Sequence, residues 1–372
     1  MGARRLLCRV RGRSCKRSRK IHHVHQRQSL QRLREQVFLA ASVVPRAVAW
    51  FSMSVCRALQ LWLFVYSIRT TDATERTKPG LKAGFLSAIG RQQQRYKHCN
   101  GTDFEPFKGN FMTASAFQID RHGNGPIIAT AIHDGHWLRP DVADVIALDE
   151  VQRLREEDPY TGRIARIAST QIVGLRSRFE VDLNRPREQA VYLQPEHAWG
   201  LEVWRTPPCQ AIIDRSLQEY DQFYVAVERL LAELLEQHGR LVVYDIHSYN
   251  HRRDGAAAPP SSSSGNPEVN IGTGTMDRRF WSPVVDRFLE DIADFDFNGR
   301  SLDVRENVKF RGGHFGSWIH RTFRQQVCAI SIEFKKTFMD EWTGEADMSL
   351  VARLSEALRS TLPGAQAELE RM

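Results

Sequence analysis

The chain has 372 residues, 42% of them hydrophobic, so it can bury the core of one large domain or of two ordinary ones. Its net charge of +8 is unevenly spread, because residues 1–71 carry 15 Lys and Arg with one acidic residue, Glu35, whereas residues 72–372 carry 37 Lys and Arg with 43 Asp and Glu. The body is therefore mildly acidic and lacks the charge of a nucleic-acid-binding protein, and the six cysteines contain no Cys-x-x-Cys pair for a thiolate zinc site.

Residues 1–75 form a basic extension, which we expect to be poorly ordered because it is rich in Arg and poor in acidic residues. Residues 37–68 within it are apolar but interrupted, and Arg57 near the centre of residues 47–68 would cost about 2.5–3.5 kcal/mol on membrane insertion. Three interpretations stay open: a true start at Met53 or later, a membrane-associated or signal-anchor segment, or an amphipathic helix. We expect a cytoplasmic protein, with anchoring or weak membrane association through this segment as the alternative.

Residues 76–372 show strand-like and helix-like segments in alternation, and we expect them to form one catalytic domain. Residues 252–275 are rich in Gly, Pro and Ser, which predicts a mobile loop that could act as a lid. The alternation predicts an α/β fold with a single mixed, mostly parallel sheet and helices on both faces. The expected strands lie within residues 126–135, 166–186, 240–250, 307–316 and 327–338, and the expected helices within residues 141–157, 217–239, 282–295 and 348–362.

Two histidines, His133 and His136, follow the first expected strand in "IHDGHWLRP". They lie three residues apart across a glycine, so a tight turn would allow both to bind one metal ion. A histidine in a loop more often faces solvent or makes an ordinary hydrogen bond. The motif is therefore a candidate metal site only in combination with other ligands.

A third histidine, His247, ends an apolar strand in "YDIHSYN". Asp245 and His247 lie on the same strand face, because side chains alternate between faces. Catalytic zinc takes three protein ligands, and a histidine ligand needs an acceptor on its other nitrogen, a role that suits Asp245. The alternative is a hydrogen-bonded histidine at the end of a buried strand.

A carboxylate, Glu333, interrupts the apolar β-branched strand "VCAISIEFKK". A buried carboxylate is costly unless it is paired or has a function, and a general base beside an activated water is one such function. The alternative is a strand-edge glutamate paired with Lys335 or Arg324.

The segment "LRSRFEVDLNRPRE" concentrates polar side chains between residues 175 and 188. Arginine forks bind carboxylates through two hydrogen bonds, so this segment suits an acidic substrate or an oxyanion that develops during attack. The alternative is a solvated charge run, although Leu183 would anchor the segment to the body. The residues concerned are Arg176, Arg178, Asp182, Asn184 and Arg185.

Taken together and in this order, five stretches resemble the N-formylglutamate amidohydrolase family, which is similar in fold to zinc carboxypeptidases and aspartoacylase-like enzymes. The resemblance covers about residues 105–345. Each stretch is weak alone, but five in the same order make a specific signal. They are "HDG" (133–135), "SRFEVDLNRP" (177–186), "DIHS" (245–248), "NVKFRGG" (307–313) and "IEFKKTFMDE" (332–341).

The resemblance implies a zinc-dependent amidohydrolase that cleaves the N-formyl or N-acyl amide of an acidic amino acid, such as N-formyl-L-glutamate. It implies one zinc ion held by His133, His247 and a third ligand, for which we prefer His136 over Glu157 or Asp158. The implied roles of the remaining residues are carboxylate binding for Asn184 and Arg185, polarisation of the scissile carbonyl for Arg178, and general base for Glu333.

Two features separate this chain from the family pattern. Carboxypeptidase-like sites use a His-x-x-Glu pair, whereas His136 occupies the fourth position here, and Ser331 stands where the family usually has Gln. Two other functions therefore remain open: a related zinc carboxypeptidase or N-acyl-amino-acid deacylase, and a non-catalytic binding protein on the same fold.

Overall fold

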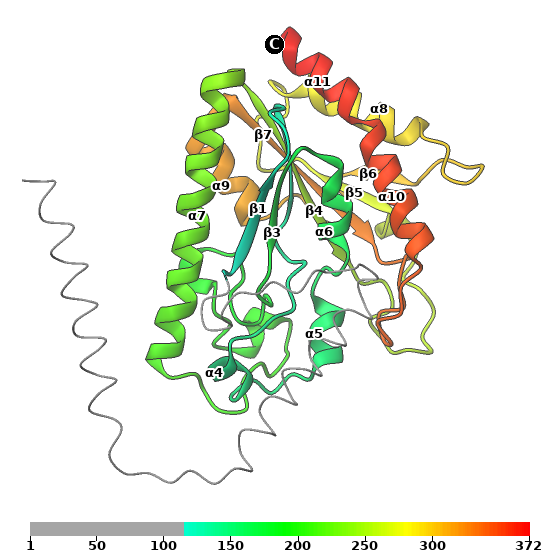
Figure 1. Cartoon of the computed structure of the whole chain (residues 1–372). Helices are drawn as coiled ribbons and strands as arrows, with labels where there is room; N and C mark the ends of the chain where they lie inside the picture. Colours follow the sequence, from blue (N-terminus) through cyan, green and yellow to red (C-terminus); the bar gives the residue numbers. More distant parts are fainter. Residues whose placement is uncertain (1–114) are drawn as a thin grey trace, which may run out of the picture. The chain divides into compact units, whose positions relative to one another are not determined.

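The computed structural model describes residues 115–372, and within them seven strands form one sheet (Figure 1). The strands are β1 (Phe117–Arg121), β2 (Ile127–Ala131), β3 (Thr170–Gly174), β4 (Leu241–Tyr249), β5 (Val269–Gly272), β6 (Val304–Glu306) and β7 (Val327–Lys335). Their order is β1-β3-β2-β4-β7-β5-β6, and only the β1–β3 and β5–β7 pairings are antiparallel. The predicted single mixed, mostly parallel sheet is confirmed.

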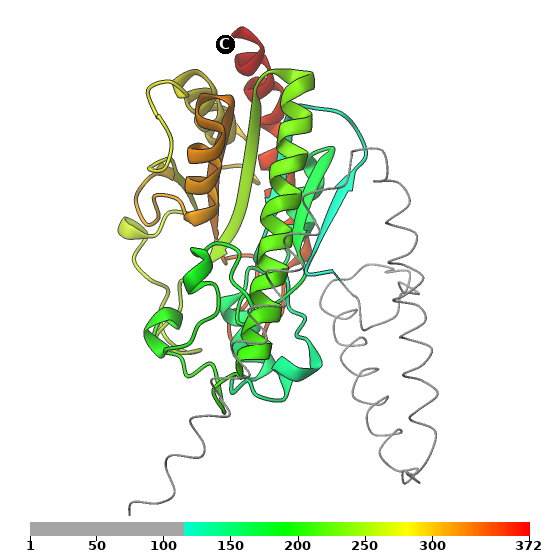
Figure 2. The same ribbon diagram turned by 90° about the vertical axis from the view of Figure 1, so that its left-hand side faces the viewer.

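Helices cover both faces of this sheet, as Figures 1 and 2 show. The α-helices are α4 (Pro140–Ala143), α5 (Glu150–Glu156), α6 (Thr161–Ile164), α7 (Gln210–His238), α8 (Ser282–Asp294), α9 (His314–Phe323), α10 (Met348–Ser360) and α11 (Leu362–Arg371). Short 3₁₀ turns are η2 (Ala165–Ile167), η3 (Arg187–Gln189), η4 (Pro195–Ala198), η5 (Ser263–Gly265) and η6 (Arg324–Gln326). Helices α7 and α9 pack on one face, and α6, α8, α10 and α11 pack on the other.

A hydrophobic core lies on each face of the sheet, because side chains of the central strands alternate between the two faces. In β4, Leu241 and Val243 belong to the core beneath α7 and α9, whereas Val242 and Tyr244 belong to the opposite core. All nine residues of β4 are buried, as expected for a central strand covered on both sides. The polar residues at its carboxyl end, Asp245 and His247, therefore lie on the α7 and α9 side.

The long helix α7 begins seven residues before its predicted start and ends where the sequence indicates. Gly239 follows its last residue with φ 73°, a left-handed conformation that favours glycine at a helix C-terminus. The apolar stripe that α7 buries includes Phe223, Val227 and Leu231. Their spacing of four residues places them on one face of the helix.

Three predicted segments, 141–157, 252–275 and 307–316, were wrong in detail. The single helix expected over residues 141–157 is two helices, α4 and α5, because the intervening chain leaves the helical path to pair Ile146 with Trp204. Helix α5 then starts afresh at Asp149, which forms a capping box with Gln152.

The strand predicted over residues 307–316 is absent, and the chain there is irregular before α9 begins. The backbone N–H groups of Lys309 and Phe310 donate to the side chain of Asn270 instead of a neighbouring strand, and Gly312 has φ 108°. Residues 252–275 also differ from the predicted loop, because their end forms the buried strand β5. Val269 and Ile271 supply its apolar face within a region whose composition otherwise indicates a loop.

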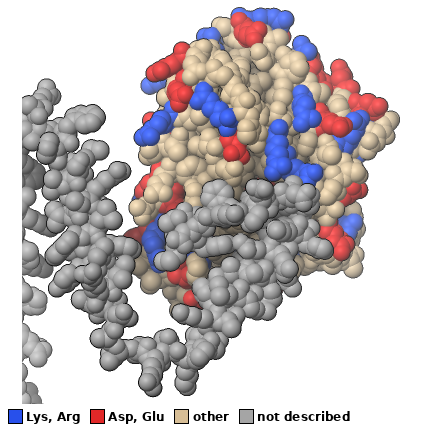
Figure 3. Space-filling model, viewed as in Figure 1, with Lys and Arg blue, Asp and Glu red and all other residues tan. Residues whose placement is uncertain are grey.

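Several expectations concern residues outside those that the structure describes. The extension 1–75, its boundary with the domain 76–372, and the apolar segment 37–68 all lie there. Among the described helices, none is both long and apolar enough to cross a membrane. On the face shown in Figure 3, acidic and basic side chains occur side by side.

His320 on α9 joins this helix to strand β7 through a hydrogen bond whose strength we expect to depend on pH. Its Nε2 accepts a hydrogen bond from the backbone N–H of Ala329 on β7, at 3.0 Å. Burial lowers the pKa of His320 to about 4, so the folded protein holds this ring neutral. An unfolded histidine binds a proton near pH 6.5, and the unfolded state therefore gains protons first as pH falls.

We accordingly expect stability to fall between about pH 6.5 and pH 4, with His320 contributing on the order of 2 kcal/mol to the loss. In His320→Gln, which retains an acceptor for Ala329, this part of the pH dependence should disappear. Urea unfolding of both proteins across this pH range measures the difference. Parallel stability curves for the two proteins would contradict the assignment.

Candidate metal centre and active site

The candidate site lies at the carboxyl ends of β2, β4 and β7, where an α/β sheet commonly places its ligands. Strand pairing brings its side chains together: in the parallel β4–β7 register, His247 lies directly beside Glu333. In the β2–β4 register, Asp245 lies beside Thr130, whose hydroxyl donates to Asp245 Oδ1 at 2.9 Å. Two residues predicted from separate motifs are thus neighbours in the folded chain.

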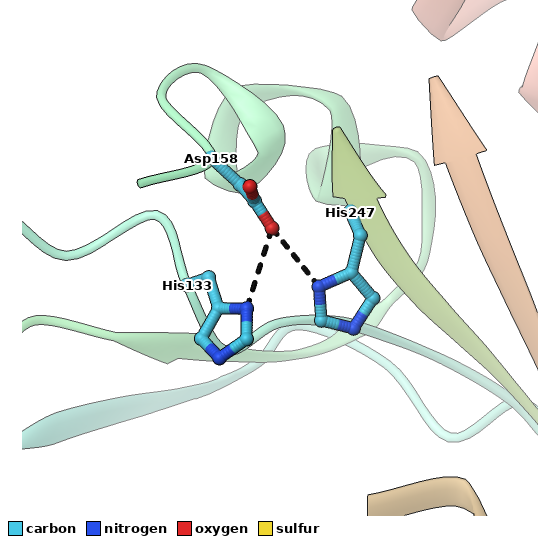
Figure 4. Close-up of side chains that lie close together, drawn as sticks. All are labelled: His133, Asp158 and His247. Carbon is cyan, nitrogen blue, oxygen red and sulfur yellow. Dashed lines mark hydrogen bonds and ion pairs between the residues drawn. The ribbon is translucent and has the colours of Figure 1, made fainter. Parts of the chain in front are cut away.

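Three buried side chains, His133, Asp158 and His247, converge at this sheet edge (Figure 4). Asp158 Oδ2 lies 3.0 Å from His247 Nδ1 and 3.4 Å from His133 Nδ1. One ligand atom from each residue lies within 4.8 Å of the others. The two rings therefore turn the same nitrogen, Nδ1, towards one carboxylate oxygen.

The opposite nitrogens of both rings face a second pair of buried carboxylates. His133 Nε2 lies 2.7 Å from Asp182 Oδ1, and His247 Nε2 lies 3.2 Å from Asp245 Oδ1. Such contacts orient a histidine ligand and select the tautomer whose other nitrogen is free to bind metal. Asp245 is thus placed as its spacing from His247 predicted, whereas the role of Asp182 was not recognised in the sequence.

The chemistry of these residues fits a small divalent metal ion. Two imidazoles and one carboxylate leave an open position, which is the ligand pattern of catalytic zinc sites. The Nδ1 atom of His133 is buried and makes no hydrogen bond within the described residues, as expected of an atom reserved for a ligand. The separations of 3.0 and 3.4 Å suit neighbouring ligands around an ion with bonds of about 2.0–2.2 Å.

His136 does not join this group, which corrects our preference for it as the third ligand. Its Nδ1 contacts Glu157, and its Nε2 lies 3.6 Å from Glu150. Burial lowers the pKa of His136, but Glu157 more than offsets this effect and raises it to about 9. Asp158, one of the two alternatives weighed against His136, occupies the place beside the other ligands.

Glu333 lies beside one of the three candidate ligands, His247, in the β4–β7 register. Burial raises the pKa of its carboxyl to about 7, with His247 opposing the shift and Asp158 and Asp245 adding to it. A carboxylate with this pKa can accept a proton near neutral pH and give it back. Its position and electrostatics are those of a general base, although the assignment remains a prediction.

Arg178 is joined to the site through Asp182. Its guanidinium donates to Asp182 Oδ2 at 2.8 Å and lies over the ring of Trp199, 4.9 Å from the centroid. Tyr192 donates its hydroxyl to the same carboxylate. Burial raises the pKa of Asp182, but Arg178 and His133 lower it well below its usual range. Arg178 therefore supplies positive charge one contact away from a candidate metal ligand.

Asn184 and Arg185 extend from the same loop in two directions. Asn184 Oδ1 accepts from the backbone N–H of Phe315 at the start of α9, and its Nδ2 lies 3.5 Å from His247 Nε2. Gly313 permits this approach, since a Cβ there would lie 2.3 Å from the Asn184 amide. The Arg185 side chain is 37% exposed and lines a cavity with five other residues, Gln189, Tyr192, Glu196, His197 and Trp199.

Comparison with known families decides what kind of protein carries this geometry. The family model described as N-formylglutamate amidohydrolase matches residues 125–339, more than half of the chain. The chain belongs to the N-formylglutamate amidohydrolase family. The resemblance recognised in the sequence is confirmed, and the match supports a hydrolase of this general type.

One solved structure shares this fold. The chain is similar to the N-formylglutamate amidohydrolase from Ralstonia eutropha JMP134, with 16% identity, a TM-score of 0.53, and coverage of 70% of this chain and 100% of that one. The chain is less similar to a gene product of Agrobacterium tumefaciens (20% identity, 67% and 96% coverage, TM-score 0.47) and to a metallo-carboxypeptidase from Pseudomonas aeruginosa (14% identity, 75% and 69% coverage, TM-score 0.32). A search of curated proteins found no match.

In this family member, Lys336 fixes the segment that carries Asp158. Lys336 is only 1% exposed, and its ammonium donates to the backbone carbonyls of Arg155 and Glu157 at 2.7 and 2.6 Å. These bonds tie the loop before Asp158 to the end of β7, three residues after Glu333. The family-like stretch "IEFKK" thus supplies both the candidate base and a support for the third ligand.

We expect Asp158→Ala and His247→Ala to weaken zinc binding roughly a hundredfold or more, because even the loss of a hydrogen-bonded partner of a ligand costs about 10- to 100-fold. His136→Asn should bind zinc within a few-fold of wild type. Competition against a chromophoric chelator measures all three affinities on the full chain. Equal weakening in His136→Asn and Asp158→Ala would overturn the choice between them.

Proposed function

We propose that this protein hydrolyses the N-formyl amide of an acidic amino acid, with N-formyl-L-glutamate as the model substrate, and that it requires one bound zinc ion. The observation that carries the proposal is the meeting of His133, Asp158 and His247 beside Glu333. Family membership supports the reaction class. The buried donor set supports the metal requirement.

The chemical step needs an electrophile, a proton acceptor and a site for the leaving group. Zinc held by the two histidines and Asp158 would act as a Lewis acid and would make the attacking water more acidic. Glu333 takes a proton from that water as its oxygen forms a bond to the formyl carbon. Glu333 then returns the proton to the amide nitrogen as the C–N bond breaks, which releases formate and the free amino acid.

Charged and polar side chains around the reacting centre serve to hold the substrate. Arg185 offers a partly exposed guanidinium for the α-carboxylate, which would fix the distance between the amide and Glu333. The Nδ2 group of Asn184 stands beside His247 as a second donor. We assign Arg178 the role of stabilising the oxyanion that develops during attack. The link from Arg178 to His133 through Asp182 supports this role.

Release of formate from N-formyl-L-glutamate tests the reaction directly. Glu333→Gln removes the proton acceptor but keeps the size of the side chain, so its kcat should fall by about 10²- to 10⁴-fold. Its zinc affinity should stay close to that of wild type. Glu356→Gln, a matched change on the exposed face of α10, should leave both quantities unchanged.

Chelation separates the metal requirement from the reaction itself. Wild-type turnover should be lost when zinc is removed and should return when zinc is added back. Formate release that continues without metal would contradict the metal-dependent mechanism but not the proposed reaction. If the zinc-loaded protein releases no formate, the proposed function is wrong.

The role of Arg185 is tested by Arg185→Met, which should raise KM by roughly tenfold or more through the loss of a charge-assisted hydrogen bond. The effect on kcat should be smaller. Arg187→Met is the matched control, because Arg187 is paired with Asp221 on the exposed surface. An equal rise in KM for both variants would contradict the assignment.

A further inference from the structure

The irregular segment 307–313 runs along one side of the proposed active site and has no role in the chemistry described so far. At its start, Asn270 accepts from the backbone N–H of Lys309 at 2.7 Å and donates to the carbonyl of Phe310 at 2.8 Å. Asn270 is itself the β5 neighbour of Glu333 in the β5–β7 register. At its end, Gly313 lies against Asn184.

Lys309 places a cation above the strand that carries His247. Its Nζ lies 5.0 Å from the centroid of the Tyr249 ring. Tyr249 follows His247 by two residues on β4, so both side chains project from the same face. The Lys309 side chain is exposed and is therefore accessible to a ligand.

Within residues 115–372, no carboxylate forms an ion pair with Lys309, although the charge of Glu333 acts on it. Its ammonium donates to the neutral amide oxygen of Asn266 at 2.5 Å, and it makes no ion pair within residues 115–372. The nearby carboxylates Glu268 and Asp303 are held by Arg300 and Arg305, at 2.7 and 2.8 Å. Burial, with Arg253 adding to it, lowers the pKa of Lys309, and the negative charge of Glu333 opposes this shift.

We propose that Lys309 forms a second carboxylate subsite, which binds the side-chain carboxylate of a dicarboxylic amino acid. The inference deepens the proposed function, on which it rests, by naming the residue that makes the enzyme prefer an acidic side chain. Arg185 and Lys309 belong to different segments, and each contacts a different part of the site, Asp182 for Arg185 and Tyr249 for Lys309. A substrate with two carboxylates can therefore engage one cation with each.

Binding of L-glutamate and L-glutamine to the zinc-loaded full chain tests this subsite without relying on turnover. The two ligands have nearly the same shape and differ in the charge of the side chain. Titration calorimetry should show wild type binding L-glutamate at least roughly tenfold more tightly, as expected for one charge-assisted hydrogen bond. Lys309→Met should abolish this ratio, and Lys309→Arg should retain most of it.

Arg359→Met on the exposed end of α10 serves as the charge-matched control and should leave the ratio unchanged. Equal binding of the two ligands by wild type, no binding of either, or a ratio that survives in Lys309→Met would each overturn the proposal. A ratio lost in Arg311→Met but kept in Lys309→Met would overturn it by moving the subsite to Arg311. The subsite is tested by the ratio of the two binding affinities, whereas the proposed function is tested by formate release, so the two failures can be told apart.

Discussion

The arrangement of the site depends on the contacts that the buried carboxylate of Asp182 makes. It accepts hydrogen bonds from the backbone N–H of Asn184 and from Tyr192, and it meets His133 Nε2 at 2.7 Å and Arg178 at 2.8 Å. A fully buried carboxylate is unfavourable unless such groups compensate it. The compensation of this one carboxylate therefore holds a candidate metal ligand, an arginine and the candidate substrate-binding loop in a single arrangement.

The same requirement governs the rest of the centre. Asp158 and Asp245 are also buried: Asp158 contacts both histidine rings, and Asp245 contacts the opposite nitrogen of His247. Burial lowers the pKa of His247, but Asp245 and Asp158 more than reverse this and raise it well above its usual value. The site thus collects negative charge around two imidazoles, which is the electrostatic setting that favours a divalent cation.

Much of the fold was predictable because its signals are local. The short, β-branched apolar runs of β2, β4 and β7 indicate strands, and the apolar stripe of α7 repeats with helical spacing. The errors occur where a distant partner decides the structure. Lys309 and Phe310 bond to the Asn270 side chain rather than to a strand, and the short strand β5 lies within a Ser- and Gly-rich region.

The sequence by itself determined the chemical types present and their order: a histidine after one strand, a histidine near the end of a second, an Asn-Arg pair between these two histidines, and a carboxylate on a third strand. It also determined that Asp245 and His247 share a face, because that follows from strand geometry. Only the tertiary structure places Asp158, rather than His136, beside the other two candidate ligands. This placement depends on the fold of the segment between β2 and β3. In that segment, Lys336 donates to the backbone carbonyl of Glu157, and the side chain of Glu157 contacts His136. These contacts join residues up to 181 positions apart, and no local pattern records them.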